Sequence, residues 1–305
     1  MKNHVTVGVD GSDESRTAAR WAAHEALLRQ VPLRLVHAVD WLLDPVLPGV
    51  GPQSADTWAD RAVTEAAEEL RGHHPNLQIT TRCPTGRPAA ALAAEAADSA
   101  LLVLGSRGLG GLTGFLVGSV ALSAVAATDT PVVLVRSTDE PQEAASNSAP
   151  GTGFGTGAGT GAGTGAGVVV GVDIQEACDR VLTFAFEEAE RRGCRLQVVH
   201  SWKMPPAYGY VPLFDSDSER DIERSVTRTV EDMLLPWRHK FPAVDVTTRV
   251  SRGSAGERLL HASRGAALVV VGRRLRHSPL GPHLGPVAHA VLHHAAAPVA
   301  IVAHP

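Results

Sequence analysis

Short apolar runs alternate with longer stretches of helical periodicity along the first 135 residues. Five short apolar runs predict strands, at Val5–Val9, Leu33–Val39, Leu77–Thr81, Leu101–Leu104 and Val132–Val135. The stretches between them are rich in Ala, Leu and Glu and predict helices, at Ser15–Arg29, Ala55–Arg71, Pro88–Ala97 and Ser119–Ala127. Apolar strands joined by helices are typical of a parallel sheet covered on both faces, and right-handed crossovers favour a doubly wound α/β sandwich.

The second part of the chain repeats the first. An offset of 163 positions pairs VTVGVDGS with VVVGVDIQ and places Asp173 over Asp10. After a shift of four residues, an offset of 167 matches Gly86, Gly105, Gly118 and Pro131 to Gly253, Gly272, Gly285 and Pro298. The same reasoning predicts five further strands, at Val168–Val172, Arg195–Ser201, Asp245–Val250, Ala267–Val271 and Val299–Ala303. Constant offsets over so many positions indicate an internal duplication.

A low-complexity segment separates the two copies. Residues 151–167 read GTGFGTGAGTGAGTGAG, and side chains this small cannot bury enough surface to hold a fold. The segment before it, STDEPQEAASNSAP, is polar. We therefore predict two domains, at 1–138 and 168–305, joined by a flexible linker at 139–167.

Composition narrows the class of protein. Hydrophobic residues make up 44% of the chain and charged residues 20%, as in ordinary globular proteins. The net charge of −4 gives no general attraction to nucleic acid, and no apolar run has the length of a membrane span. The N-terminus lacks the pattern of a signal peptide, and the three cysteines are scattered without CxxC spacing. These features lead us to expect a cytoplasmic protein.

The strand pattern also predicts where a ligand binds. Asp10 follows the first strand, and the glycine-rich loop that starts at Gly105 follows the fourth. If the strand order is 3-2-1-4-5, these two strands are neighbours at the point where the order reverses, which is where open parallel sheets bind ligands. A carboxylate there can accept hydrogen bonds from ribose hydroxyls, and glycines let backbone N–H groups approach a phosphate.

The loop itself, GSRGLGGLTGFLVGSV at 105–120, fits neither of two common nucleotide motifs. It contains no lysine and no Gly-Lys-Ser/Thr, so it is not a P-loop. Gly114 comes one residue too late after Gly108 and Gly110 for a dinucleotide fingerprint, and the loop follows the fourth strand instead of the first.

The spacing Gly105-x-x-Gly108-x9-Gly118-Ser119, with VGVDGS at the first strand end, resembles the ATP-binding motif of the universal stress protein family. LVHAVD, TGRP and TPVVLVR strengthen this resemblance, which covers both halves and suggests a tandem protein of the actinobacterial type. It implies two flavodoxin-like, adenine-nucleotide alpha-hydrolase-like domains, each with a doubly wound parallel five-stranded sheet.

The resemblance also implies which residues bind ATP, with Mg²⁺ left open as an accompanying ion. Gly8, Val9 and Asp10 would line the adenosine, and the backbone of Ala38 would meet the adenine. The phosphates would be wrapped by the loop and the start of the following helix, that is, by Gly105, Ser106, Arg107, Gly108, Leu109, Gly110, Gly111, Gly118, Ser119 and Val120. Ser119 could instead be the N-cap of the following helix. Arg107 could instead be an ordinary solvated side chain in the loop.

The second half departs from this motif at two positions. Leu275 stands where the middle glycine is expected, and Pro286 stands in place of the serine. A leucine crowds the phosphate, and a proline removes both a hydroxyl and an N–H. We expect this half to keep the fold and to have lost standard ATP binding. Residual nucleotide binding stays open, because Asp173 is retained and four nearby residues can attract an anion: Arg273, Arg274, Arg276 and His277.

The sequence contains no motif that predicts a catalytic or metal site. His289 and His293 have helical i, i+4 spacing, but no carboxylate or cysteine completes a metal site, so surface or interface histidines are the better interpretation. His37 and His200, at the ends of the second strands, are expected to be buried structural or dimer-contact residues. No catalytic residues are assigned, because neither a serine-nucleophile elbow nor an HExxH motif occurs.

Three functions therefore compete. The first is an ATP-binding regulator of stress or dormancy without fast catalysis. The second is a slow ATPase or another nucleotide-dependent enzyme on the same fold, and the third is a scaffold in which both sites are vestigial. The resemblance further implies that the two halves form a pseudo-dimer through their last strands and that two chains form a homodimer. We also expect an unidentified regulatory protein partner, and no binding to nucleic acid or membranes.

Overall fold

The computed structural model describes residues 4–38, 52–106, 117–136, 167–203, 216–275 and 284–305. The first repeat comprises β1 (Val5–Gly8), α1 (Asp13–Arg29), β2 (Leu33–Val36), α2 (Pro52–His73), β3 (Ile79–Arg82), α3 (Pro88–Ala96), β4 (Leu101–Gly105), α4 (Ser119–Ala127) and β5 (Val132–Val135). The second repeat comprises β6 (Val168–Gly171), α5 (Asp179–Arg192), β7 (Leu196–Trp202), α6 (Ser216–Lys240), β8 (Val246–Arg252), α7 (Ala255–Ala262), β9 (Leu268–Arg274), α8 (Pro286–His294) and β10 (Val299–His304).

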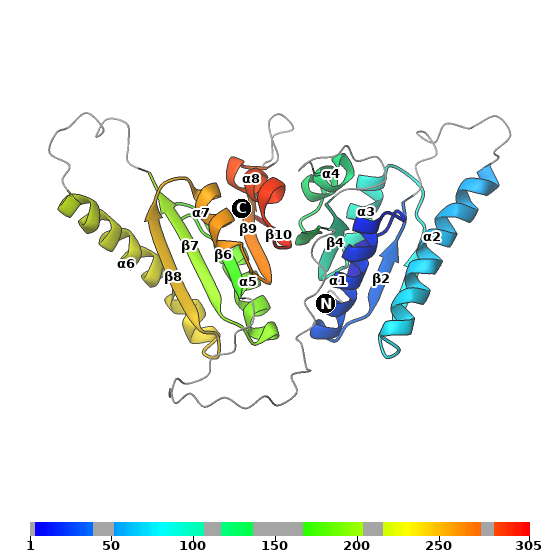
Figure 1. The fold of residues 1–305 in the computed structure, drawn as a ribbon, viewed down its shortest axis with the longest axis horizontal. Coiled ribbons are helices and arrows are strands. Elements are labelled where there is room, and N and C mark those ends of the chain that lie inside the picture. The colour runs from blue at the N-terminus through cyan, green and yellow to red at the C-terminus, as the bar shows by residue number, and fades with distance from the viewer. Residues whose placement is uncertain (1–3, 39–51, 107–116, 137–166, 204–215, 276–283) are drawn as a thin grey trace, which may run out of the picture.

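The ten strands of these described segments form one sheet in the order β3-β2-β1-β4-β5-β10-β9-β6-β7-β8. Within each repeat the strands are parallel, and the order 3-2-1-4-5 that the sequence suggested is confirmed. The two repeats join where β5 and β10 pair antiparallel, with Val299 opposite Leu134 and Ile301 opposite Val132. This confirms the predicted pairing of the last strands. Figure 1 shows the result, with β10 near the middle and α2 and α6 at opposite ends.

Helices cover both faces of the sheet. Side chains of α1, α2, α5 and α6 share one buried cluster, and side chains of α3, α4, α7 and α8 share a second. Alternation along β4 shows the two faces, because Leu101 and Val103 belong to the first cluster whereas Leu102 and Leu104 belong to the second. The α/β class predicted from consecutive apolar positions is therefore confirmed.

Element boundaries differ from the sequence predictions by a few residues. The strand predicted to reach Val39 ends at Val36, before His37 and Ala38, and Val39 lies outside the described residues. The first helix begins at Asp13 because the Ser12 hydroxyl accepts a hydrogen bond from the Ser15 N–H at 3.2 Å. Ser12 is thus the N-cap of α1.

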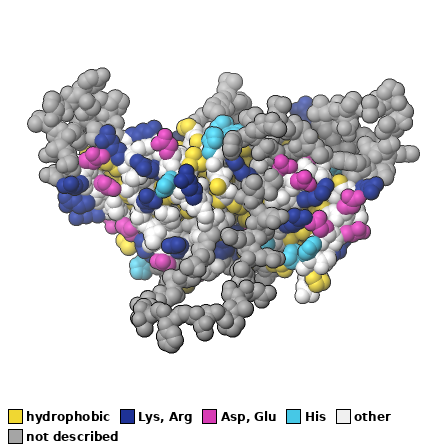
Figure 2. Space-filling model, in the orientation of Figure 1, with side chains coloured by type: hydrophobic (Ala, Val, Ile, Leu, Met, Phe, Trp, Pro, Cys, Tyr) yellow, Lys and Arg dark blue, Asp and Glu magenta, His cyan; other side chains and the backbone are white. Residues whose placement is uncertain are grey.

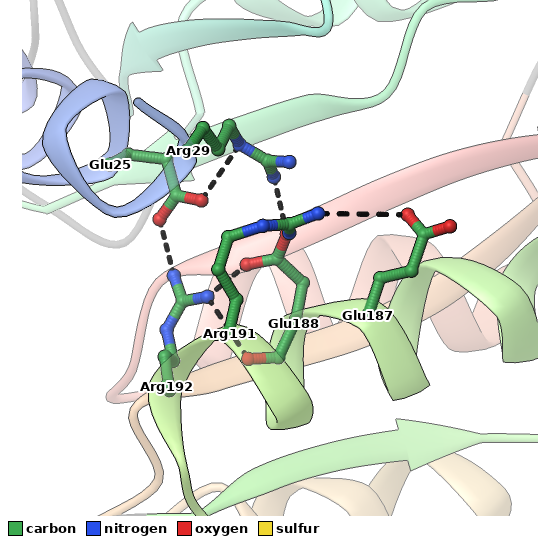
Figure 3. Close-up of polar contacts among 6 residues, drawn as sticks. All are labelled: Glu25, Arg29, Glu187, Glu188, Arg191 and Arg192. Carbon is green, nitrogen blue, oxygen red and sulfur yellow. Dashed lines mark hydrogen bonds and ion pairs between the residues drawn. The ribbon is translucent and has the colours of Figure 1, made fainter. Parts of the chain in front are cut away.

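Two pairs of charged residues, one pair from each repeat, meet between α1 and α5 (Figure 3). Within the helices, Arg29 Nε lies 2.9 Å from Glu25 Oε1, and Arg192 pairs with Glu188. Across the junction, Arg29 pairs with Glu188, and Arg192 Nη2 lies 2.5 Å from Glu25 Oε2. Glu188 and Arg192 stand 163 positions after Glu25 and Arg29, so the contact is symmetric under the internal duplication.

Two further residues complete this group, which we call the Glu–Arg cluster. Arg191 Nη1 lies 2.6 Å from Glu188 Oε1, and Arg191 Nη2 lies 3.8 Å from Glu187 Oε2. The Glu25 and Glu188 side chains have no exposed area. The cluster thus places three carboxylates and three guanidiniums at the junction, so its formal charges balance.

Arginines also connect each repeat to a helix end of the other. Arg136 donates to the carbonyl of Leu292 in α8 at 2.9 Å, and Arg273 donates to the carbonyl of Thr128 at the end of α4 at 2.8 Å. Carbonyls at helix C-termini carry partial negative charge and favour such cations. Elsewhere on the face seen in Figure 2, basic and acidic side chains lie interspersed over both ends.

Candidate functional site

The candidate site of the first repeat lies where β1 and β4 end. These strands are adjacent and parallel, with Val7 opposite Val103, so both chains leave the sheet at the same edge. Asp10 follows β1, and Ser106 follows β4. Because β1 separates β2 from β4 in the sheet order, this edge is the switch point at which parallel sheets bind ligands.

The turn after β1 holds the Asp10 carboxylate in place. Asp10 Oδ1 accepts hydrogen bonds from the Ser12 N–H at 3.0 Å and from the Ser12 hydroxyl at 2.5 Å. Gly11 between them has φ +82°, a left-handed conformation that favours glycine. The carboxylate is therefore fixed at the strand end by its own turn and by the N-cap of α1.

Gly8 and Val9 form the floor of this edge. A β-carbon on Gly8 would lie 2.6 Å from Leu104 Cδ2 and 3.1 Å from Leu92 Cδ2, so these two side chains pack directly against the Gly8 backbone. Val9 is buried, and its carbonyl contacts Nδ1 of His37 at 2.7 Å. His37 is itself buried, as predicted, and Ala38 beside it is half-buried.

The glycine-rich loop begins and ends at one point. The Ser106 N–H donates to the Val135 carbonyl at 2.8 Å, and the Ser106 carbonyl accepts from the Gly118 N–H at 2.9 Å. The two ends of the loop are therefore joined by a direct hydrogen bond beside Gly105. Five residues predicted to bind phosphate lie outside the described residues: Arg107, Gly108, Leu109, Gly110 and Gly111.

Helix α4 starts immediately after this closure. Gly118 is its N-cap, with φ −63° and ψ 148° and no side-chain cap, and Ser119 is the first helical residue. The N-cap alternative for Ser119 was therefore wrong. Ser119 and Val120 are exposed, and the first N–H groups of a helix lack intrahelical partners, so this helix start offers N–H donors toward the strand ends.

The equivalent edge of the second repeat contains a cavity of about 370 Å³. His200 Nδ1 contacts the Val172 carbonyl at 2.9 Å, as His37 contacts Val9, and the prediction that both histidines are buried is confirmed. Helix α8 starts with Gly285 as N-cap and Pro286 as the first residue, so the proline replaces Ser119 without disturbing the helix start. Burial raises the pKa of the Cys178 thiol, which also lines this cavity.

The strands beside this cavity are longer than their counterparts. Pairing of β4 with β5 ends at Gly105 opposite Val135, whereas β9 and β10 continue beyond Gly272 to Arg274 opposite His304. This extension was not evident from the sequence. It turns the first residues of the expected anion loop into sheet.

The extension also redirects the arginines that were expected to attract an anion. Arg273 is only 5% exposed and reaches the Thr128 carbonyl and Asp129 of the first repeat, so that expectation is wrong for Arg273. Arg274 lies 2.5 Å from Glu176 through Nη2. Arg276 and His277 lie outside the described residues.

Other candidate groups add no second site. His289 and His293 lie on α8 with ring centroids 4.3 Å apart, but His293 is buried, so a surface position is wrong for it. Among the described residues, no group of three or more His, Cys, Asp or Glu side chains is arranged to hold a metal ion. Cys83, Cys178 and Cys194 are all among the described residues, and they form no disulfide with one another. In the part of the chain that the structure describes, every helix is too short or too polar to cross a bilayer.

Known proteins resemble this chain in both sequence and fold. The model of the Universal stress protein family matches residues 1–136 and 167–303. Universal stress protein Rv2005c of Mycobacterium tuberculosis is 31% identical over 312 residues, which cover 98% of this chain and 97% of that protein. The crystal structure of a universal stress protein from Archaeoglobus fulgidus DSM 4304 has the same fold, with a TM-score of 0.68, 15% identity and full coverage of both chains. A solved structure described as a universal stress protein in complex with cAMP is 29% identical, covers 44% of this chain and 97% of its own, and has a TM-score of 0.35.

Proposed function

This chain belongs to the universal stress protein family, and on that premise we propose that its first repeat binds ATP at the edge formed by β1 and β4. Nucleotide occupancy then regulates a partner or an assembly, without fast catalysis. In this proposal the functional units are a domain at 1–138, a linker at 139–167 and a second domain at 168–305. Four features remain predictions: Mg²⁺ bound with the ATP, a homodimer of two chains, a regulatory protein partner and a cytoplasmic location.

One observation carries the proposal: the loop closure between Ser106 and Gly118 at the end of β4. The 2.9 Å hydrogen bond brings the beginning of the glycine-rich loop to the start of α4. Asp10 follows the neighbouring strand β1. A carboxylate for ribose hydroxyls and a helix start for phosphates therefore occupy the same sheet edge, which suits a nucleotide.

The proposed contacts divide the site into two parts. The adenosine side consists of Gly8, Val9, Asp10 and the backbone of Ala38. The phosphate side consists of Gly105, Ser106, Gly118, Ser119 and Val120, together with the loop residues Arg107, Gly108, Leu109, Gly110 and Gly111. A partner that binds the ATP-occupied form of this edge more tightly than the empty form responds to the nucleotide.

The substitution Ser119→Pro tests the proposal with little effect on the fold. Pro286 is the natural residue at the matching position of the second repeat, and Gly118 already has the extended ψ of 148° that a following proline requires. The change removes one N–H and one hydroxyl from the proposed phosphate site. We expect ATP affinity, measured by equilibrium dialysis, to fall about tenfold, since a hydrogen bond to a charged group contributes about 1.5–3 kcal/mol.

The matched control is Pro286→Ser, which makes the reciprocal change in the second repeat. ATP affinity and the thermal unfolding midpoint should both stay at the values of the unmodified chain. Unchanged ATP affinity in Ser119→Pro, with the protein folded, would show that the phosphates do not bind at the start of α4.

A further inference from the structure

The cavity of the second repeat has the size of a small-molecule site. Its volume of about 370 Å³ falls in the range of roughly 300–1,000 Å³ that is usual for ligand pockets. Much of its wall is apolar, formed by Val172, Val181, Val199, Leu259, Val271 and Val287. Such a pocket favours a ligand with a flat or apolar body.

The nucleoside side of the first site is reproduced here. Asp173 is exposed at the end of β6, in the position of Asp10, and its Oδ1 accepts from the Gln175 N–H at 3.0 Å. A β-carbon on Gly171 would lie 2.7 Å from Leu259 Cδ1, which repeats the contact of Gly8 with Leu92, where the corresponding distance is 3.1 Å. The shape of this half of the site is therefore common to both repeats.

The phosphate side is occupied by protein. A β-carbon on Gly272 would lie 2.7 Å from His304 Nε2, so the imidazole covers the glycine backbone that a phosphate would approach. The N–H of Leu275 is already engaged, because it donates to the His304 carbonyl at 2.7 Å. At the described start of this loop, the backbone of Gly272 is thus covered by an imidazole, and the N–H of Leu275 is used within the sheet.

The Glu176 carboxylate lies beside Arg274 and His304, where a ligand phosphate would otherwise bind. Its Oε1 lies 2.5 Å from Arg274 Nη2, and its Oε2 lies 3.7 Å from His304 Nε2. The glutamate can reach them because α5 begins at Asp179, whereas the residue matching Glu176 in the first repeat, Asp13, is already the first residue of α1. The later helix start leaves Glu176 in the turn beside the cavity.

The charges of the lining groups follow from this arrangement. Asp173 and Glu176 each carry one negative charge, and Arg274 carries one positive charge. The guanidinium that could bind a phosphate is already paired with Glu176. Bringing a further anion next to these carboxylates is unfavourable.

We propose that the second cavity binds an uncharged nucleoside and that Glu176 excludes its phosphorylated forms. The nucleoside class rests on the proposed function of the first repeat, because the two repeats share the adenosine side of the site. The exclusion of phosphate rests on Glu176, Arg274 and His304, which are specific to the second repeat. The two repeats therefore differ in ligand: a nucleotide in the first and a nucleoside in the second.

Cys178 provides a local readout for this proposal in the full-length chain. It lines the cavity and is 7% exposed, whereas Cys194 lies in the same repeat outside the cavity lining and Cys83 is exposed in the first repeat. Alkylation by iodoacetamide is followed at each cysteine by peptide mass spectrometry. Adenosine should slow alkylation of Cys178 severalfold and leave Cys83 and Cys194 unchanged, and AMP or ATP at the same concentration should leave all three unchanged.

The variant Glu176→Gln tests the exclusion of phosphate. It frees Arg274 from its carboxylate partner, so AMP should now protect Cys178 at a concentration about tenfold or more below that needed in the unmodified chain. Glu176→Asp keeps the charge and should not gain AMP protection. The proposal is overturned if AMP or ATP protects Cys178 in the unmodified chain as well as adenosine does, if no compound protects it, or if Glu176→Gln leaves the preference unaltered. The proposal for the first repeat is tested independently, by measuring the ATP affinity of the Ser119→Pro variant.

Discussion

Replacing Glu188 by alanine is expected to lower the free energy of unfolding by about 3–5 kcal/mol. Glu188 has no exposed side-chain area and pairs with Arg29, Arg191 and Arg192. Without Glu188, three guanidinium groups remain at the junction, and Glu25 is the one buried carboxylate left in the cluster to pair with them. Breaking a buried ion pair from one side costs far more than the intact pair contributes, because the remaining charges keep their desolvation penalty.

Urea denaturation of the full chain measures this effect, with Glu65→Ala as the control. Glu65 pairs with Arg61 on the surface of α2, where the side chains are 61% and 76% exposed, so its loss should cost less than about 0.5 kcal/mol. A double-mutant cycle with Arg29→Ala then isolates the contact between the repeats. A cost for Glu188→Ala as small as that for Glu65→Ala would mean that the Glu–Arg cluster does not hold the repeats together.

The cluster also predicts a dependence on pH. Burial raises the pKa of the Glu188 carboxyl, but Arg192, Arg29 and Arg191 outweigh burial and leave this pKa below its usual range. A carboxyl whose pKa is lowered by folding stabilises the protein at neutral pH, and this stabilisation is lost as the pH falls through the folded-state pKa. Burial and the Glu188 charge raise the pKa of Glu25. Because the two carboxyls interact and share the same guanidiniums, they take up protons as a pair.

Replacing Asp10 by alanine is expected to weaken ATP binding about a hundredfold. The change removes the proposed carboxylate acceptor for the ribose and also the two hydrogen bonds, at 3.0 and 2.5 Å, that fix the turn before α1. Losing one or two hydrogen bonds to a charged group costs about 3 kcal/mol, which corresponds to a factor of about a hundred. Isothermal titration with ATP measures the loss.

The internal duplication supplies the control for Asp10. Asp173→Ala changes the matching carboxylate of the second repeat, and we expect ATP affinity to be the same as in the unmodified chain. Asp10→Asn keeps an acceptor for Ser12 and removes the charge, so its ATP affinity should fall between those of Asp10→Ala and the unmodified chain. Equal losses in Asp10→Ala and Asp173→Ala would contradict the assignment of ATP to the first repeat.

Local patterns in the sequence predicted most of the fold. Short apolar runs predicted each of the ten strands that the structure describes, and the strand Val132–Val135 and the helix Ser119–Ala127 have the predicted bounds. The constant offsets predicted the duplication, and the strand order 3-2-1-4-5 predicted that Asp10 and the loop at Gly105 follow adjacent strands, as they do. These features depend on hydrophobic burial and chain connectivity, which a sequence records directly.

Features that depend on contacts between the repeats were missed. Glutamates and arginines on a helix usually face solvent, so Glu25 and Arg29 gave no sign of burial, although the offset of 163 would have shown their match to Glu188 and Arg192. Arg273 was interpreted as an anion-binding residue because it follows Gly272, whereas its direction is set by the first repeat. The pairing of Glu176 with Arg274 requires the later start of α5, which the pattern of side chains did not indicate.

The central claim is that one repeat of this chain binds ATP and the other does not. Its most direct test is the nucleotide content of the purified full-length protein, released by denaturation and quantified against protein concentration after saturation with ATP and removal of the free nucleotide. We predict about one ATP per chain, retained by tight binding, and its loss from Asp10→Ala but not from Asp173→Ala. Two ATP molecules per chain, or one that is lost from Asp173→Ala and kept by Asp10→Ala, would contradict the account.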